Sequence, residues 1–210
     1  MTARDEILQG VREALGGGQD QPAATPEARI RIPEVARDAR IESLFRAVSA
    51  LAGKTFLAGS PAEVREYVAG LIGSGPAVAS NAPLLRECGI ADLAAVQTGF
   101  TDLEALRQAC ASAAFGITSA EYALADTGTL VMLSSVEEAR MVSLLPPVHI
   151  AVVPRVRILT GLDELLWMAP HPGRSTSSMV LITGPSRTAD IEQILVRGVH
   201  GPGEIHVLVL

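Results

Sequence analysis

The hydrophobic positions of the chain change period several times, and each change predicts a new element. Ile7, Leu8, Val11 and Leu15 recur at helical spacing before three glycines, which predicts one amphipathic helix at the N-terminus. Residues 16–34 are rich in Gly, Pro and polar side chains and show no sustained period, so we expect a flexible or extended linker. The helix is therefore expected to be an arm, which either folds back on its own domain or docks on another chain.

From about Arg37 short apolar runs alternate with helical patterns, as in a parallel sheet whose strands are joined by helices. The serine, proline and glutamate of residues 60–63 are typical of a helix start, and Asn81 is expected to begin the next helix. The expected elements are a helix to residue 51, a strand over 55–58, a helix over 62–72, a strand over 77–79, a helix from 83, a strand over 93–96 and a helix after 102.

The pattern changes at residue 115. Three short apolar runs, over 115–119, 122–125 and 129–134, leave little room for helices and predict a hairpin or antiparallel piece. The remaining expected elements are a helix over 135–144, a buried strand over 149–153, a helix over 162–168, a polar loop over 171–177, a strand over 178–183, a helix over 188–196 and a terminal strand over 205–210. We therefore expect an α/β domain over residues 35–210, with a mostly parallel sheet flanked by helices and a small antiparallel element, preceded by the separate segment 1–34.

Composition favours the same fold class. The chain has 210 residues, 48% of them hydrophobic, which is enough for one sizeable core and short for two. Only 3% of the residues are aromatic, so the core must be built from Val, Leu, Ile and Ala. Such cores are typical of parallel sheets covered by helices.

Charge and cysteine usage exclude several classes of function. The formal net charge is −6 and the basic residues form no dense run, which argues against nucleic acid as a partner. No stretch reaches the roughly 20 apolar residues that span a bilayer, and charges interrupt the first 15 residues, so we expect a cytoplasmic protein. Cys88 and Cys110 stand far apart, which excludes a self-contained iron–sulfur or zinc-ribbon site and indicates two buried thiols. We expect no metal and no cofactor.

The segment 183–190, Thr-Gly-Pro-Ser-Arg-Thr-Ala-Asp, is the first candidate binding motif, because it joins an expected strand to an expected helix. Amides at a helix start and the positive end of the helix dipole suit an anion, and Arg187 could add a forked cation. The alternative is that Ser186 only caps the helix and Asp190 stabilises its dipole. The segment matches neither a Walker loop nor a dinucleotide fingerprint, so ATP and NAD have no support. The candidate ligand-binding residues here are Gly184, Ser186, Arg187, Thr188 and Asp190.

A second candidate motif is the turn 126–129, in which Thr127, Gly128 and Thr129 could contact a ligand without bulk. Glu121 lies five residues before Asp126, so the two carboxylates are candidates for acid–base or nucleophilic work. The alternative is one solvated glutamate and one aspartate that bonds within its own turn.

The third motif is the glycine-proline turn that follows His200. His200 and Gly201 are better placed for a pocket than the other histidines, whereas His149 lies in an apolar run and is expected to be a satisfied core residue. No set of histidines has the spacing of metal ligands.

These three turns, in this order, resemble the LUD-domain proteins, in particular those of the lactate-utilisation protein C type. The resemblance is carried by YALADTGTLVML, LLPPVHIAVVP and ITGPSRTADIEQILVRGVHGPGEIHVLVL, together with the N-terminal helix and its linker. It covers nearly the whole chain.

The resemblance implies an α/β fold related to the NagB/RpiA/CoA-transferase group. It also implies a role in a bacterial system that oxidises L-lactate to pyruvate beside iron–sulfur partner proteins. Because this chain lacks cluster-binding cysteines, it is expected to be the cluster-free component and to bind a small anionic metabolite. The alternatives are a stand-alone enzyme like CoA transferases, sugar-phosphate isomerases or formyltetrahydrofolate cyclo-ligases, and a non-catalytic scaffold. A homo-oligomer formed through the N-terminal arm is a further expectation, and whether the chain is an enzyme stays open.

Overall fold

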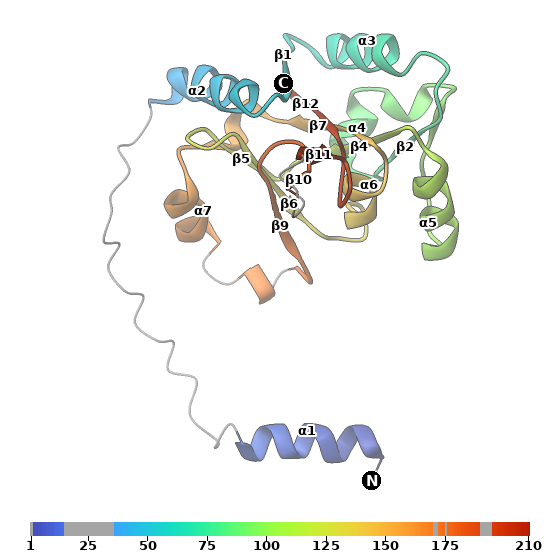
Figure 1. Cartoon of the computed structure of the whole chain (residues 1–210), viewed down its shortest axis with the longest axis vertical. Helices are drawn as coiled ribbons and strands as arrows, with labels where there is room; N and C mark the ends of the chain where they lie inside the picture. Colours follow the sequence, from blue (N-terminus) through green and yellow to red (C-terminus); the bar gives the residue numbers. More distant parts are fainter. Residues whose placement is uncertain (1, 15–35, 170–171, 175, 190–194) are drawn as a thin grey trace. The chain divides into compact units, whose positions relative to one another are not determined.

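The computed structural model describes residues 2–14, 36–169, 172–174, 176–189 and 195–210 (Figure 1). The chain divides into two compact units, Met1–Pro33 and Glu34–Leu210. In the first unit, α1 (Ala3–Ala14) confirms the predicted amphipathic helix. Its start is fixed by a reciprocal pair, since Thr2 N donates to Asp5 Oδ2 at 2.9 Å and Asp5 N donates to Thr2 Oγ1 at 3.3 Å. The predicted linker lies outside the described residues.

A six-stranded parallel sheet forms the centre of the second unit and confirms the predicted α/β fold (Figure 1). All neighbouring strands run parallel. Their order across the sheet is β1 (Lys54–Leu57), β12 (Glu204–Val209), β7 (Val148–Val153), β4 (Phe115–Ser119), β2 (Ala77–Ala79) and β3 (Val96–Gln97).

A second, smaller sheet contains the predicted antiparallel element. β5 and β6 pair as a hairpin and β9 extends it antiparallel to β6, while β8 lies parallel to β5. The run 115–119 joins the main sheet instead. The four strands are, in order, β8 (Ile158–Leu159), β5 (Tyr122–Leu124), β6 (Thr129–Leu133) and β9 (Met179–Ile182).

Apart from α6, the helices of the second unit begin near the predicted starts. Ser60 caps α3 as expected, since its Oγ accepts from Glu63 N at 3.3 Å. Asn81 caps no helix; its Oδ1 accepts from Gly99 N at 2.8 Å, so that prediction is wrong. The helices are α2 (Arg37–Ala50), α3 (Pro61–Ile72), α4 (Pro83–Glu87), α5 (Leu103–Ser112), α6 (Arg140–Leu144) and α7 (Leu162–Met168), with short 3-10 turns η1 (Ile90–Asp92), η2 (Arg155–Arg157) and η3 (Pro172–Arg174).

The predicted helix over 135–144 is shorter than expected and starts at Arg140. Ser135 Oγ accepts from the amides of Glu137 and Glu138 at 3.1 and 3.0 Å, which holds residues 135–138 in a turn. A serine side chain that bonds nearby amides in this way competes with helix formation.

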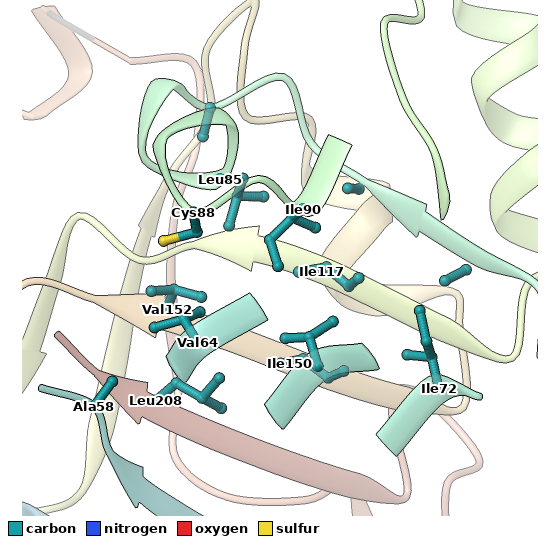
Figure 2. Close-up of a cluster of buried hydrophobic side chains, with 14 residues drawn as sticks. Ala58, Val64, Ile72, Leu85, Cys88, Ile90, Ile117, Ile150, Val152 and Leu208 are labelled. Atoms are coloured by element: carbon teal, nitrogen blue, oxygen red, sulfur yellow. The ribbon is translucent and has the colours of Figure 1, made fainter. Parts of the chain in front are cut away.

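One face of the main sheet is covered by α3 and α4, and the core between them is aliphatic (Figure 2). Val64 and Ile72 of α3 and Leu85 of α4 pack over Ile117, Ile150 and Leu208 of the central strands. β-branched and Leu side chains fill this layer, so the core is packed although the chain has few aromatic residues.

The other face carries α2, the small sheet, α5 and α6. Leu44 and Val48 of α2 pack with side chains of β6 and of β7 and β12 in one buried cluster. A second cluster joins Leu106 and Cys110 of α5 to Val78 and Val142. These layers hold the ends of the central strands beside the small sheet, where the candidate pocket lies.

The predicted helix over 188–196 is wrong. β10 (Arg187–Ala189) and β11 (Leu195–Arg197) pair antiparallel to each other, and residues 190–194 lie outside the described residues. The segment contains the β-branched residues Thr188 and Val196, which favour strands. This strand pair is bonded to its surroundings, because Ser186 N donates to Pro202 O at 2.8 Å and Gly198 N to Ser186 O at 3.1 Å.

Candidate functional site

A pocket of about 450 Å³ lies where β9 leaves the small sheet. Five of the residues predicted to bind a ligand line it together: Gly184, Ser186, Arg187, His200 and Gly201. The rest of the wall is formed by Leu51 after α2, by α6, by β9 and the turn after it, and by β12 and the loop before it: Leu51, Ser143, Leu144, Val180, Leu181, Ile182, Thr183, Pro185, Pro202 and Ile205. Four segments of the chain, around residues 51, 143–144, 180–187 and 200–205, therefore meet in one pocket.

The pocket lies at the amino-terminal ends of the central parallel strands. His200, Gly201 and Pro202 come just before β12, and Ser143 and Leu144 come just before β7. The small sheet supplies the remaining side through the end of β9. Its position is thus set by the packing of the small sheet against the main sheet.

Gly184 allows the turn after β9 to approach the end of α2 closely. Its φ is +85°, and a Cβ added there would lie 3.0 Å from Leu51 Cβ. The Arg187 guanidinium reaches the same place, where its Nη2 donates to Leu51 O. An arginine side chain has five N–H donors in a fork, so this bond orients the group and leaves other donors for a ligand.

The predicted amide cradle is not present in the expected form. No helix begins after Ser186, and the Ser186 amide already donates to Pro202 O. No helix dipole therefore contributes to anion binding at this turn. What remains for an anion is the side-chain chemistry of the pocket, namely the Arg187 cation, the exposed His200 ring and the Ser186 hydroxyl.

A chain of hydroxyl groups connects the turn 126–129 to this pocket. Thr127 Oγ1 donates to Asp126 Oδ1 at 3.1 Å and lies 2.8 Å from Thr129 Oγ1. Thr129, which is buried, lies 2.8 Å from Thr183 Oγ1, and Thr183 lines the pocket.

The carboxylate at the start of this chain sets the direction of its hydrogen bonds. Each hydroxyl has a single proton. Thr127 gives its proton to Asp126, so Thr129 must donate to Thr127 and Thr183 to Thr129. Thr183 Oγ1 therefore faces the pocket as a hydrogen-bond acceptor.

Gly128 has a structural role in this turn. Its φ is +71°, and a Cβ there would lie 2.8 Å from Val48 N, so the turn packs directly on the backbone of α2. Of the predicted residues, Thr127 and Thr129 join the pocket only through Thr183.

The two candidate catalytic carboxylates do not form a pair. Glu121 forms an ion pair with Arg157 at 3.0 Å, and Asp126 accepts from Thr127. Neither lines the pocket. Thr188 lies in β10, where its side chain is not described, and Asp190 lies outside the described residues.

Sequence reasoning did not select Thr183, Ser143 or Leu51 as site residues. Thr183 directly precedes the predicted turn, so its place at the end of an expected strand was an available signal. Ser143 and Leu51 come from helix ends distant in sequence, and only the packing of α2 and α6 brings them to the pocket.

The buried thiols and His149 lie apart from the pocket. Burial raises the pKa of Cys88 and Cys110 to about 11, as expected for thiols in a core. Burial lowers the pKa of His149 to about 4; its Nε2 bonds Thr118 Oγ1 at 2.7 Å. Its Nδ1 has no partner in the described parts of the chain, so this histidine is only partly satisfied.

Within the described ranges, no three His, Cys, Asp or Glu side chains come together as metal ligands do. Every helix in those ranges is too short or too polar to cross a membrane.

Comparison with known proteins gives relatives that share one name. Lactate utilization protein C of Halalkalibacterium halodurans is 42% identical over 106 residues, which are 49% of this chain and 46% of that protein. Lactate utilization protein C of Anoxybacillus flavithermus is 31% identical over 74% of each chain. Lactate utilization protein C of Bacillus subtilis is 45% identical over 91 residues, or 41% of this chain and 38% of that protein. The match thus spans less than half of two of these relatives.

Among solved structures, the crystal structure of a DUF162 family protein from Deinococcus radiodurans is similar, with a TM-score of 0.66. It is 21% identical, and the match covers 83% of this chain and 98% of that chain, which shows a shared fold. The family model of the LUD domain matches residues 41–210, which include both sheets and every wall of the pocket. The chain therefore belongs to the LUD domain family.

Proposed function

We propose that the chain is the cluster-free component of an L-lactate utilisation system and that its pocket binds the hydroxy acid. The names of its relatives support the pathway, since three of them are lactate utilization protein C. The chain has only two cysteines, both buried, so electrons from lactate would pass to iron–sulfur partner proteins rather than to a cluster held here.

The observation that carries the proposal is the pairing of Arg187 and Thr183 in one pocket. L-lactate has a carboxylate and, on the next carbon, a hydroxyl group. The Arg187 fork is suited to the carboxylate, and the acceptor oxygen of Thr183 is suited to the hydroxyl proton. Pyruvate has a keto oxygen in place of that hydroxyl and cannot donate to Thr183. The pocket should therefore prefer lactate to pyruvate.

Isothermal titration calorimetry with L-lactate and pyruvate tests this preference. We expect Arg187→Ala to weaken the binding of both acids by about 1.5–3 kcal/mol, the range for a hydrogen bond to a charged group. Arg65→Ala is the matched control, because Arg65 also donates to a backbone carbonyl, that of Gly89, and does not line the pocket. Equal affinities in Arg187→Ala and the unaltered chain would remove Arg187 from the site.

Thr183→Val tests the hydroxyl separately. The change removes the acceptor oxygen and keeps the shape, so lactate should lose affinity while pyruvate keeps its own. If the unaltered chain binds the two acids equally well, the oriented hydroxyl chain has no part in recognition.

The role in the pathway is tested in the bacterium that encodes the chain. Deletion of its gene should abolish growth on L-lactate and leave growth on pyruvate intact. Tagged chain purified from lactate-grown cells should carry iron through its partners. Normal growth of the deletion strain on L-lactate would contradict the proposed role.

A further inference from the structure

The outer edge of β9 differs from the other strand edges in the described sheets. A strand at a sheet edge presents a row of backbone N–H and C=O groups to which another strand can add, and natural edges are commonly blocked by charge or kept short. β1 begins with the exposed Lys54, β10 and β11 carry Arg187 and Arg197, and β3 and β8 have two residues each. β9 (Met179–Ile182) has four residues with no charge and no proline, and it pairs with β6 alone among the described strands.

The register of β9 with β6 shows which of its backbone groups face outward. Ser134 N donates to Ser178 O at 2.9 Å, directly before β9 begins. Bonded and non-bonded residues alternate along an antiparallel ladder, so the even-numbered residues of β9 bond to β6. The N–H and C=O groups of Met179, Leu181 and Thr183 are therefore directed away from the sheet. Within the described parts of the chain, no backbone group bonds to them on that side.

The side chains along this edge are apolar. Leu181 lies at its centre and is 42% exposed. Side chains alternate between the two faces of a strand, so Leu181 lies on the same face as Met179. Met179 packs against the buried cluster that includes Val131 and Leu165. A second strand at this edge would thus extend both the backbone ladder and this apolar layer.

The edge is complementary to itself. In a two-fold dimer a residue near the axis lies opposite its own copy, so a charge there would repel itself; residues 177–184 carry none. The three outward residues are evenly spaced about Leu181. Antiparallel pairing about this residue places Leu181 opposite Leu181 of the second copy, and Met179 opposite Thr183 of the second copy. Each of these pairs can exchange two N–H···O bonds.

We propose that β9 pairs antiparallel with β9 of a second copy of this chain, so that the two four-stranded sheets join across a two-fold axis at Leu181. Residues 180–183 also line the pocket described above, so the second copy lies beside that pocket in the dimer. The contact itself is made by backbone groups and leucine side chains, and it does not depend on what the pocket binds.

Sedimentation equilibrium of the full chain is the first test. The mass should be twice the 22.0 kDa of one chain. Leu181→Lys places two like charges opposite each other and should raise the dissociation constant of the dimer at least about tenfold. Leu166→Lys is the matched control, because Leu166 of α7 is 44% exposed, and it should leave the constant unchanged.

Oxidative cross-linking tests where the two copies meet. The Cα atoms of a hydrogen-bonded antiparallel pair are about 5.5 Å apart, a separation that a disulfide can span. Leu181→Cys should therefore give a covalent dimer on oxidation, whereas Leu166→Cys should stay a single chain on a denaturing gel. The native thiols, Cys88 and Cys110, are buried and should not react. Two copies held together only through α1 would not bring positions 181 this close.

The proposal is overturned if the full chain stays monomeric at about 0.1 mM, a concentration at which even a weak specific dimer forms. A dissociation constant that Leu181→Lys leaves unchanged would place the contact elsewhere on the molecule. If circular dichroism shows that Leu181→Lys does not fold, the cross-linking of Leu181→Cys decides, and the absence of a covalent dimer there would overturn the proposal.

Discussion

Asp126 influences the pocket at the end of β9 without lining it, because it fixes the direction of a chain of hydrogen bonds that ends there. It fixes the direction of the hydrogen bonds from Thr127 to Thr183, and so decides whether Thr183 accepts or donates at the pocket wall. The sequence identified Asp126 as a candidate catalyst; the structure favours a positioning role, because its carboxylate bonds Thr127 and does not line the pocket.

Glu138 should make the stability of the fold depend on pH. Its pKa in the folded state, about 8, lies above the ordinary 4.5, so the folded state holds the proton more tightly and the free energy of unfolding falls as pH rises between these values. His149, whose pKa is lowered from 6.5 to about 4, has the opposite effect only below pH 6.5. Between pH 6.5 and 8 we therefore expect a loss of roughly 1–2 kcal/mol.

Urea unfolding of the unaltered chain and of Glu138→Gln, at several pH values across that window, measures this loss. The variant should show no such slope, because its amide does not titrate. Parallel slopes in the two proteins would place the ionising group elsewhere.

The sequence could not have distinguished Glu138 from Glu137. The two are identical neighbours in a polar turn, and each has the same local signals. Only the packing of that turn on β2 and β4 buries one and leaves the other exposed. When distant strands determine whether a residue is buried, the neighbouring sequence does not reveal its burial.

At the scale of elements, local patterns predicted most of the main sheet and its covering helices. Short apolar runs gave β1, β2, β4, β7 and β12, because buried parallel strands are apolar along their length. The pairing of β10 with β11 was missed, because Ser-Arg-Thr-Ala-Asp-Ile-Glu over residues 186–192 also matches a helix start. The hydrogen bonds of Ser186 with Pro202 and Gly198 favour the strand over the helix, and they depend on tertiary structure.

The contact of α6 with β4 requires a glycine at position 116. A Cβ there would lie 2.0 Å from Val142 O, so Gly116→Ala should force the helix away from the sheet and lower stability by several kcal/mol. Gly70→Ala is the matched control, since nothing lies within 4 Å of the added Cβ in α3, and it should stabilise by about 0.5–1 kcal/mol. Thermal unfolding measures both. A Gly116→Ala protein as stable as the unaltered chain would show that α6 does not pack this closely.

For the molecule as a whole, the role of the first unit, which contains α1, stays a prediction. The helix α1 has twelve residues, and helices of that length are marginal in water unless they pack against something. Its apolar residues Ile7, Leu8 and Val11 are suited to docking on a second copy or on a protein of the lactate system. Docking on its own domain is the competing expectation.

Deletion of residues 1–34 distinguishes these cases. The remaining domain contains both sheets and all four buried clusters, so it should unfold in one cooperative transition. Light scattering and purification with partners should show weaker assembly. If the shortened chain aggregates or unfolds, α1 belongs to the core; if assembly is unchanged, the arm has no docking role.

The parallel sheet carries different polar groups at its two ends. The pocket lined by Arg187 and Thr183 lies at the amino-terminal ends of β7 and β12, and Glu138 lies at the carboxyl ends of β2 and β4. The first contains the Arg187 cation, and burial raises the pKa of the Glu138 carboxyl at the second to about 8. This separation allows each to be altered without changing the other.

A crystal structure of the purified chain soaked with L-lactate tests the proposed binding site directly. The carboxylate is expected beside the Arg187 guanidinium and the hydroxyl within hydrogen-bond distance of Thr183 Oγ1, in the pocket between β9 and the loop before β12. Lactate bound elsewhere at full occupancy, or an empty pocket at a concentration that saturates binding in solution, would contradict it.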